Sequence, residues 1–470
     1  MKVILINPPE YQGYKYVREG RCEQRTSSYQ YSLPPLSLMS TTAVLEKEGI
    51  NVKILDCIAK DVSLEKLEKI LEREQPELII VNFSTPSYYG DKKVADISKK
   101  LKIFSAAIGV HSTALPDETL SDTNFDFIIR GEPEITTKEL VRELGKNLPK
   151  LEKVNGLSYK NGKKIYHNAS RPFIENLDEL PFPARHLVDN KKYLFPFSEE
   201  PWTLLSANRG CPYNCIFCTA HLYCGKSQRF RSPKNIADEI EEIVTKFRIK
   251  KIGMWGEIFT LNKGIVEKVS NEIKGRKLDI DWYVTSRVDS IDRYRIKNLM
   301  SAGCKALTLG VESGSQKILD NIKKGITIKQ TLRTIRLCKK FGLETQAHLI
   351  FGLPGETKET IKDTIKFIIK ANPDYANFYC AIPFPGTEFW DYVIKNNYLI
   401  TRDWSKFEIN NAILSYPNLK TLEILNAKRT AFIKFYFRQS KIAEILSKHK
   451  ISDYNKLIKN GYTFFREWVM

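Results

Sequence analysis

The sequence predicts an α/β protein with two successive parallel sheets, first a Rossmann-like sheet and then a partial (β/α)6 barrel, followed by a helical C-terminal region. Short apolar runs alternate with stretches of helical periodicity across residues 1–145, and the alternation resumes across residues 201–390. Continuous apolar strands separated by helices are typical of parallel sheets covered on both faces. The sequence therefore predicts four parts: residues 1–145, a linker at 146–200, a barrel at 201–390 and a helical domain at 391–470.

In the first part, the carboxyl ends of the predicted strands carry small or loop-forming residues. Ser84-Thr85 follows one apolar run, and Gly109-Val110-His111 follows the next. Open α/β sheets bind ligands at this edge, so we expect a ligand site there. The first strand is not followed by GxGxxG, which argues against a nicotinamide cofactor. The predicted strands are residues 3–6, 51–55, 78–83, 103–108 and 125–129, and the helices are residues 36–47, 64–73, 92–101 and 136–144.

The later parts are predicted from the same periodicities. Within the linker, Asn161-Gly162 is typical of a hairpin turn, and Leu180-Pro181-Phe182-Pro183 of an extended crossing between domains. Residues 422–448 are predicted to be helical and mix bases with aromatic residues. Six apolar runs, each followed by a helical pattern, indicate a partial barrel. Its predicted strands are residues 203–206, 251–255, 281–285, 306–310, 344–351 and 375–381.

Composition narrows the class of protein. The 74 Lys and Arg residues against 55 Asp and Glu give a formal charge of +19. Such an excess indicates either anionic partners or a Lys-rich solvated surface, and charge alone does not separate them. Apolar runs of about 18 residues, the length of a membrane span, are absent. Nine cysteines in a long chain without secretory features favour metal or redox use over a disulfide scaffold, and we expect a cytoplasmic protein.

The sharpest feature is a cysteine cluster directly after the first predicted barrel strand. Cys211, Cys215 and Cys218 have the spacing CxxxCxxC on one short loop. Three thiolates so placed can hold a [4Fe–4S] cluster and leave one iron open for another ligand. Structural zinc is the alternative, since Cys224 or His221 could supply the fourth ligand that zinc requires. The position at the catalytic end of a barrel strand favours the iron–sulfur cluster.

The cysteine loop, with Phe217 before its third cysteine, resembles the signature of radical S-adenosylmethionine (SAM) enzymes. Further segments resemble this family in the right order along the barrel. They are Trp255-Gly256-Glu257, Gly310-Val311-Glu312-Ser313-Gly314, Ile350-Phe351-Gly352-Leu353-Pro354-Gly355-Glu356 and Ile382-Pro383-Phe384-Pro385-Gly386-Thr387.

The resemblance implies that SAM chelates the open iron and is cleaved to a radical that abstracts hydrogen from an unactivated carbon. An external electron donor such as ferredoxin or flavodoxin would supply the electron. Glu257 would meet the SAM ammonium group, and Arg287 and Glu312 its carboxylate or ribose. For Arg287 and Glu312 an ordinary barrel salt bridge is an equal alternative. The residues that the resemblance assigns to SAM are Phe217, Gly256, Glu257, Arg287, Glu312, Ser313, Gly352 and Pro354.

The N-terminal part resembles the cobalamin-binding domain of class B radical SAM enzymes, through Leu33-Pro34-Pro35-Leu36, Gly109-Val110-His111-Ser112-Thr113-Ala114 and Arg130-Gly131-Glu132-Pro133-Glu134. The resemblance places cobalamin contacts at Ser84, Thr85, Gly109 and His111. One departure is the absence of the Asp-x-His-x-x-Gly motif that supplies an axial histidine in other cobalamin proteins. Bound cobalamin would therefore lack that lower ligand; alternatively the domain serves as a scaffold.

The resemblance favours methyl transfer to an unactivated carbon of a small-molecule or lipid substrate, because family members modify isoprenoid, hopanoid and tetrapyrrole compounds. Radical cyclisation or C–C bond formation without methyl transfer is the alternative reaction. A nucleic-acid-modifying or nucleic-acid-binding protein is disfavoured, since RNA-binding signatures are absent. The tail is expected to pack its aromatics on the barrel with its bases facing solvent, and an interfacial helix at a membrane surface is the alternative. The residues concerned are Lys428, Arg429, Lys434, Arg438 and Lys441, with Phe432, Phe435, Tyr436 and Phe437.

Overall fold

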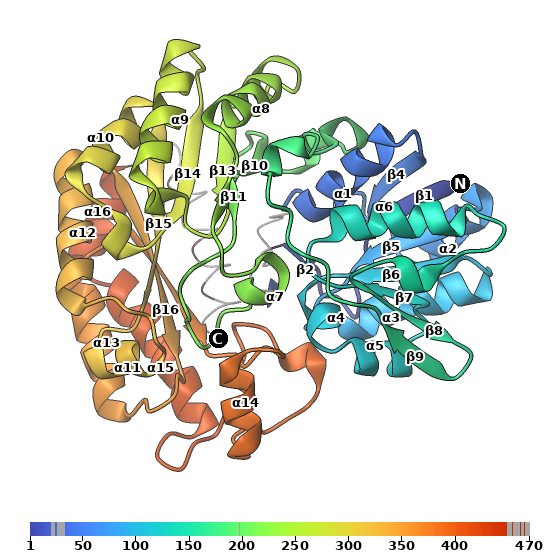
Figure 1. Cartoon of the computed structure of the whole chain (residues 1–470). Helices are drawn as coiled ribbons and strands as arrows, with labels where there is room; N and C mark the ends of the chain where they lie inside the picture. The colour runs from blue at the N-terminus through green and yellow to red at the C-terminus, as the bar shows by residue number, and fades with distance from the viewer. Residues whose placement is uncertain are drawn as a thin grey trace.

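A computed structural model describes residues 1–19, 24–25, 33–196, 198–448 and the single residues 454, 461 and 465. Two sheets dominate the molecule: a seven-stranded sheet in the N-terminal part and a six-stranded sheet in the later part (Figure 1). Helices lie over both faces of the first sheet and around the outside of the second. The predicted α/β fold class is confirmed.

The N-terminal sheet has the strand order β4-β1-β5-β6-β7-β8-β9, parallel from β4 to β7 and antiparallel beyond. Its centre is apolar on both faces, because Ile4 and Ile6 of β1 join one buried cluster while Val3 and Leu5 join another. This explains the uninterrupted apolar run. The strands are β1 Lys2–Asn7, β4 Asn51–Asp56, β5 Leu78–Asn82, β6 Phe104–Ile108, β7 Phe127–Ile129, β8 Leu157–Asn161 and β9 Lys164–His167.

The predicted hairpin is present as β8 and β9, and it extends the N-terminal sheet rather than standing apart from it. A two-stranded ribbon, β2 Tyr16–Val17 with β3 Gln24–Arg25, precedes the first helix. The helices of this part are α1 Leu36–Lys47, α2 Leu64–Glu74, α3 Tyr88–Lys100, α4 Val110–Ala114, α5 Pro116–Asp122 and α6 Pro133–Leu144.

The second sheet is a partial barrel with all six strands parallel and in chain order. Its helices begin at polar caps; for example, Ser232 caps α8 ahead of Pro233, and Thr327 forms a capping box at α12. The strands are β10 Trp202–Ser206, β13 Lys251–Trp255, β14 Asp281–Ser286, β15 Cys304–Glu312, β16 Glu344–Phe351 and β17 Tyr375–Cys380. The helices are α7 Ala220–Cys224, α8 Pro233–Thr245, α9 Lys263–Gly275, α10 Arg293–Ser301, α11 Gln316–Asn321, α12 Ile328–Phe341, α13 Lys358–Ala371 and α14 Glu388–Lys395.

The tail packs on the barrel as two helices, α15 Thr421–Tyr436 and α16 Gln439–Ser447, rather than as one stretch. Phe435 is fully buried, and the Tyr436 hydroxyl bonds both the N–H and the carbonyl of Ala376 on β17, at 2.9 Å each. The expectation that the tail's bases face solvent is wrong for two of them. Lys428 and Lys441 are buried, and their ammonium groups are satisfied there. Lys428 bonds the Asn410 side chain, and Lys441 bonds a backbone carbonyl.

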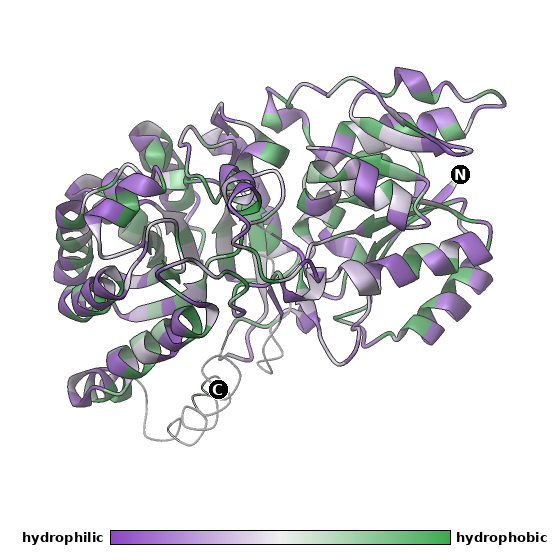
Figure 2. Ribbon diagram, turned by 90° about the horizontal axis from the view of Figure 1, so that it is seen from below, coloured by the Kyte–Doolittle hydropathy of each residue, from purple (hydrophilic) through white to green (hydrophobic). Residues whose placement is uncertain are grey.

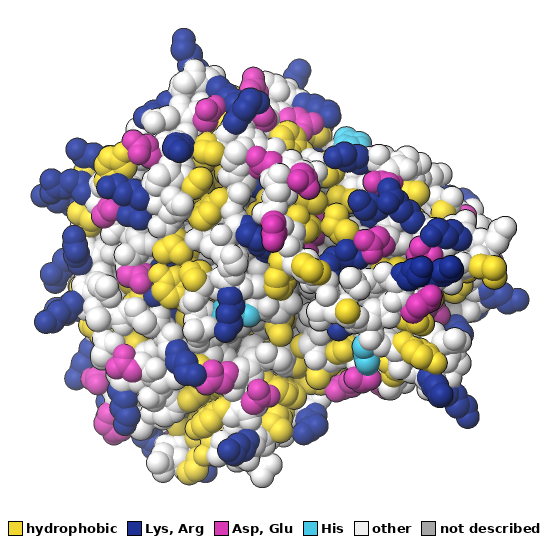
Figure 3. All heavy atoms as spheres, in the orientation of Figure 1, with side chains coloured by type: hydrophobic (Ala, Val, Ile, Leu, Met, Phe, Trp, Pro, Cys, Tyr) yellow, Lys and Arg dark blue, Asp and Glu magenta, His cyan; other side chains and the backbone are white. Residues whose placement is uncertain are grey.

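Hydrophobic residues line the inner side of the barrel helices, and hydrophilic residues face outward (Figure 2). Lys and Arg side chains are spread around the rim of the face drawn in Figure 3, with acidic side chains between them. The described helices include none that is long and apolar enough to cross a membrane. Association of the tail with a membrane surface stays a prediction.

Candidate functional site

The three cysteines lie on the loop that leaves β10 through a short ribbon, β11 Asn208–Arg209 paired with β12 Arg229–Phe230. Gly210 has a φ of +87°, and a Cβ there would stand 1.9 Å from the Ser227 carbonyl oxygen. The ribbon can therefore turn into the cysteine loop only through glycine. Cys211, Cys215 and Cys218 form no disulfide; Cys211 is buried, and Cys215 and Cys218 are partly exposed.

Backbone hydrogen bonds hold the cysteine loop to two other parts of the barrel. The Ile216 N–H donates to the Ile322 carbonyl, 3.2 Å away, at the end of α11. The Ile216 carbonyl accepts from the Phe389 N–H of α14 at 2.9 Å. Phe217 packs against the edge of the barrel core. The loop is thus held by backbone hydrogen bonds, and these bonds do not use its thiol groups.

The alternative of structural zinc lacks its fourth ligand. The His221 imidazole Nε2 lies 2.9 Å from the Cys211 carbonyl, and the Cys224 thiol donates to the Ala220 carbonyl at 2.9 Å. Among the described residues, no three His, Cys, Asp or Glu side chains are arranged to hold a single metal ion. Three thiols on one loop are the donor set of a [4Fe–4S] cluster, so the residues present fit that group.

The segment after β13 faces the cysteine loop. Glu257 is buried, and its carboxylate accepts from the Tyr223 hydroxyl of α7 at 3.1 Å. The backbone of Gly256 lies so close to Asn208 that a Cβ would stand 2.6 Å from the Asn208 Oδ1. The Asn208 side chain is fully buried with both polar atoms unpartnered, and sequence reasoning missed it. An unsatisfied buried amide beside Glu257 fits the approach of a polar ligand such as SAM.

Two buried cations flank Cys215. Lys324 donates to the Glu312 carboxylate at 2.6 Å, and both side chains are 8% exposed. Arg287 pairs with Asp289 at 2.9 Å and lies over the Tyr213 ring, so it does form the salt bridge held open as an alternative. Burial raises the pKa of the Cys215 thiol, and the charge of Lys324 opposes this.

Lys324 was not predicted. Burial disfavours its charge, but Glu312 outweighs that cost and raises the pKa of Lys324 above its ordinary value. Glu312 itself has a φ of +61° at a bulge in β15, which turns its carboxylate toward Lys324. The only sequence signal for this pair is the Lys-Lys-Gly run that follows α11.

The remaining barrel residues predicted to contact SAM form tight turns. The Ser313 hydroxyl bonds Thr364 at 3.1 Å, which ties the end of β15 to α13. Gly352, at a φ of +93°, donates its N–H to the Glu356 carboxylate, and the Pro354 carbonyl accepts from Asn321. Burial raises the pKa of Glu356 to about 8. Ile424 of α15 fills the space beside Gly352, where a Cβ would stand 3.1 Å from it, so contact of this turn with SAM stays a prediction.

In the N-terminal sheet, the structure brings together three of the four residues predicted to contact cobalamin. Thr85 Oγ1 lies 3.2 Å from His111 Nδ1, and a Cβ at Gly109 would stand 2.1 Å from the Phe83 carbonyl oxygen. Burial lowers the pKa of His111 to about 3, so its ring is neutral, and its Nε2 is buried without a partner. Ser84 lies on the same loop and bonds Ser87 at 2.6 Å.

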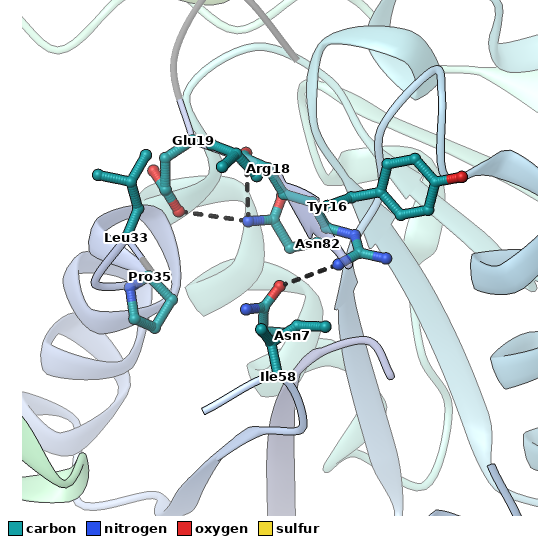
Figure 4. Close-up of a pocket in the computed structure, with 9 residues that line it drawn as sticks. Asn7, Tyr16, Arg18, Glu19, Leu33, Pro35, Ile58 and Asn82 are labelled. Carbon is teal, nitrogen blue, oxygen red and sulfur yellow. Dashed lines mark hydrogen bonds between the residues drawn. The ribbon is translucent and has the colours of Figure 1, made fainter. Parts of the chain in front are cut away.

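A small cavity of about 10 Å³ opens beside the carboxyl ends of β1 and β5 (Figure 4). In it Asn7 accepts from Arg18, while Asn82 donates to Glu19 at 3.3 Å. Arg18 also forms a fully buried ion pair with Asp91 at 2.7 Å, which sequence reasoning did not find. Burial raises the pKa of Glu19 to about 7. The cavity has room for about one water, but the unpartnered His111 nitrogen and this polar edge supply hydrogen-bonding groups where open α/β sheets bind ligands, and such groups suit a polar cofactor such as cobalamin.

The two candidate sites face each other. Helix α4, which starts directly after Gly109, packs on α7, which starts two residues after Cys218. Trp404, in the segment after the barrel, packs edge-on against His111 with centroids 4.9 Å apart and bonds Glu118. The carboxyl edge of the first sheet therefore adjoins the cysteine loop of the second.

Comparison with known protein families assigns a family to each half of the chain. The B12 binding domain family matches residues 25–141, and the radical SAM superfamily matches residues 205–368. A B12-binding sheet ahead of a radical SAM barrel defines the class of cobalamin-dependent radical SAM enzymes.

The chain is 34% identical over 452 residues to a protein of Pyrococcus horikoshii named uncharacterized methyltransferase PH0819, covering 96% of this chain and 95% of that one. It is 26% identical to the anaerobic magnesium-protoporphyrin IX monomethyl ester cyclase of Cereibacter sphaeroides, covering 87% and 68%. The solved structure of OxsB with aqua-cobalamin and SAM has a TM-score of 0.77 at 18% identity, covering 99% and 71%.

The chain therefore belongs to the class B radical SAM enzymes, and it shares the family of the Pyrococcus methyltransferase. Its cofactors are a [4Fe–4S] cluster, SAM and cobalamin. These assignments confirm the predicted family and cofactors. The individual contact residues and the domain boundaries stay predictions.

Proposed function

We propose that this enzyme transfers a methyl group to an unactivated carbon of a small molecule. The observation that carries the proposal is the packing of α4 on α7, which sets the cobalamin-type edge of one sheet against the cysteine loop of the other. Methyl transfer needs both cofactors within reach of one substrate. The name of the Pyrococcus relative supports the same reaction class.

When bound, the cluster and SAM supply a hydrogen-abstracting radical, and cobalamin supplies the methyl group. The chain's residues hold and orient these groups: Cys211, Cys215 and Cys218 ligate the cluster through their thiolates. Glu257 would accept from the SAM ammonium, and the turn at Gly352–Gly355 would lie near the adenine. His111, which burial keeps neutral, would offer cobalamin a hydrogen-bonding nitrogen rather than a ligand to the cobalt.

The reaction is tested by anaerobic reconstitution followed by incubation with SAM carrying a deuterated methyl group. Either dithionite or flavodoxin serves as reductant. Candidate substrates include isoprenoid lipids, the class we propose first, and tetrapyrroles. The expected products are S-adenosylhomocysteine, 5′-deoxyadenosine and a substrate that has gained a labelled methyl group. Loss of hydrogen with ring closure and no label would instead support cyclisation, the activity named for the Cereibacter relative.

The ligand assignment has its own matched pair of variants. Cys215→Ala is expected to lose most of the cluster iron and all 5′-deoxyadenosine, because three thiolates are the minimum set. Cys224→Ala is expected to keep both, since that buried thiol bonds the Ala220 carbonyl. Iron content and low-temperature EPR measure the outcome. Equal iron loss in both variants would contradict the assigned ligands.

A further inference from the structure

Two buried carboxylates and two partly buried guanidinium groups join the two halves of the chain beside the cysteine loop. Arg209 of β11 pairs with Glu134 at 2.5 Å and with Glu132 at 3.3 Å. Arg229 of the facing strand β12 pairs with Glu132 at 2.9 Å. The glutamate side chains are 2% and 5% exposed and the arginine side chains 17% and 9%, so bulk water has limited access to the set. We name these four residues the sheet-joining network.

One end of the network leads to the predicted cobalamin edge. Glu132 and Glu134 lie at the start of α6, directly after the turn at Gly131. The Gly131 N–H donates to the Thr113 hydroxyl of α4 at 3.2 Å. The Thr113 N–H in turn donates to the Gly109 carbonyl at 3.1 Å. Short hydrogen-bonded steps therefore connect the Gly109 turn to the two carboxylates.

The other end leads to the cluster ligands. Arg209 is two residues from Cys211 and is followed by Gly210, whose backbone allows no side chain. Arg229 donates to the carbonyl of Cys224, the last residue of α7, at 2.7 Å. The network thus holds both the entry to the cysteine loop and the end of the helix that follows it.

The energetics favour a positioning role over a stabilising one. A largely buried set of paired charges adds little net stability compared with apolar residues of the same shape, and here the Arg229 Nε is buried without a partner. Charge-assisted hydrogen bonds from a planar guanidinium are, however, strongly directional. Such a network fixes the angle and spacing of the parts that it joins.

We propose that Glu132 and Glu134 are positioning residues that set the distance between bound cobalamin and the iron–sulfur cluster. Their carboxylates, at the start of α6 in the N-terminal part, orient Arg209 and Arg229 and through them the cysteine loop. The inference rests on both cofactors binding where the proposed function places them, and it does not depend on which reaction follows.

The test is a distance measurement by pulsed EPR between cob(II)alamin and the reduced cluster in the loaded full-length enzyme. Wild type is expected to show one narrow distance distribution, and Glu134→Gln one at least twofold broader. Glu134→Asp, which keeps the charge, is expected to recover most of the narrow distribution. If Glu134→Gln loses a cofactor, Glu132→Gln, which removes the other carboxylate of the network, is measured in its place with the same expected broadening.

The matched control is Glu239→Gln, which removes an equally buried carboxylate from between Arg185 and Arg231. That triad joins the linker to the barrel and includes no residue of the N-terminal sheet. Its distance distribution is expected to match wild type. The inference is overturned if Glu134→Gln with full iron and cobalt keeps the narrow distribution, or if Glu239→Gln broadens it equally. Failure of the proposed function would appear separately, as wild type that binds both cofactors and transfers no methyl group.

Discussion

Lys324 offers the sharpest test of the barrel electrostatics. Its ammonium lies 2.6 Å from the Glu312 carboxylate with both side chains 8% exposed, so Lys324→Gln leaves a buried carboxylate without its cation. Breaking a buried pair in this way costs about 3–5 kcal/mol. Lys323→Gln is the matched control, since its neighbouring ammonium pairs with Glu388 where the side chains are 54% and 58% exposed. An exposed pair is worth about 0–1 kcal/mol.

The assay is urea unfolding of the cofactor-free chain, monitored by tryptophan fluorescence. Lys324→Gln is expected to lower the free energy of unfolding by about 3–5 kcal/mol, and Lys323→Gln by less than about 1 kcal/mol. The double variant Lys324→Gln with Glu312→Gln is expected to recover most of the loss, because no unpaired charge then remains buried. A loss in Lys324→Gln no larger than in Lys323→Gln would refute the reasoning.

Two further variants test other strained or buried positions. Gly109→Ala is expected to lower stability in thermal melts by about 3 kcal/mol or more, because its Cβ would meet the Phe83 carbonyl oxygen at 2.1 Å and its φ is +131°; an unchanged melting temperature would contradict this. The Glu356 carboxyl has a pKa of about 8 in the folded chain against 4.5 in the unfolded chain, so it ionises first in the unfolded chain as the pH rises. Between pH 4.5 and 8, the free energy of unfolding of wild type is therefore expected to fall by up to about 5 kcal/mol relative to that of Glu356→Gln. Parallel stability–pH curves for the two proteins would show that Glu356 ionises normally.

The strands were predictable because their signal is local. The apolar run at residues 3–6 lies inside β1, and residues 251–255 coincide with β13, since the centre of a strand buried on both faces must be apolar. The tail shows where local pattern fails. Its helical periodicity is real, but the helix ends at Tyr436, and the Arg438 guanidinium bonds Ile369 and Asn372 of the barrel. Tertiary contacts therefore decided a boundary that periodicity alone left continuous.

The cysteine ligands were predictable for a related reason, because all three lie within eight residues of one another. Their charged neighbours were not. Lys324 and Glu312 are separated by 12 positions, and Arg209 and Glu134 by 75. A basic residue in a sequence is by default solvated. Nothing local distinguishes Lys324 from the exposed Lys323 beside it.

Three of the ion pairs with little exposure share a place in the fold that explains both their presence and the lack of a local sequence signal for them. Asp91 pairs with Arg18 and accepts from the Ser84 N–H, Glu134 pairs with Arg209 before the cysteine loop, and Lys324 stands beside Cys215. Each pair therefore holds a loop at the carboxyl edge of a sheet. Apolar packing is non-directional, so it can position a strand but does not fix the orientation of a loop. Fixing the orientation of a loop requires directional, charge-assisted hydrogen bonds, and here these join segments far apart in the chain.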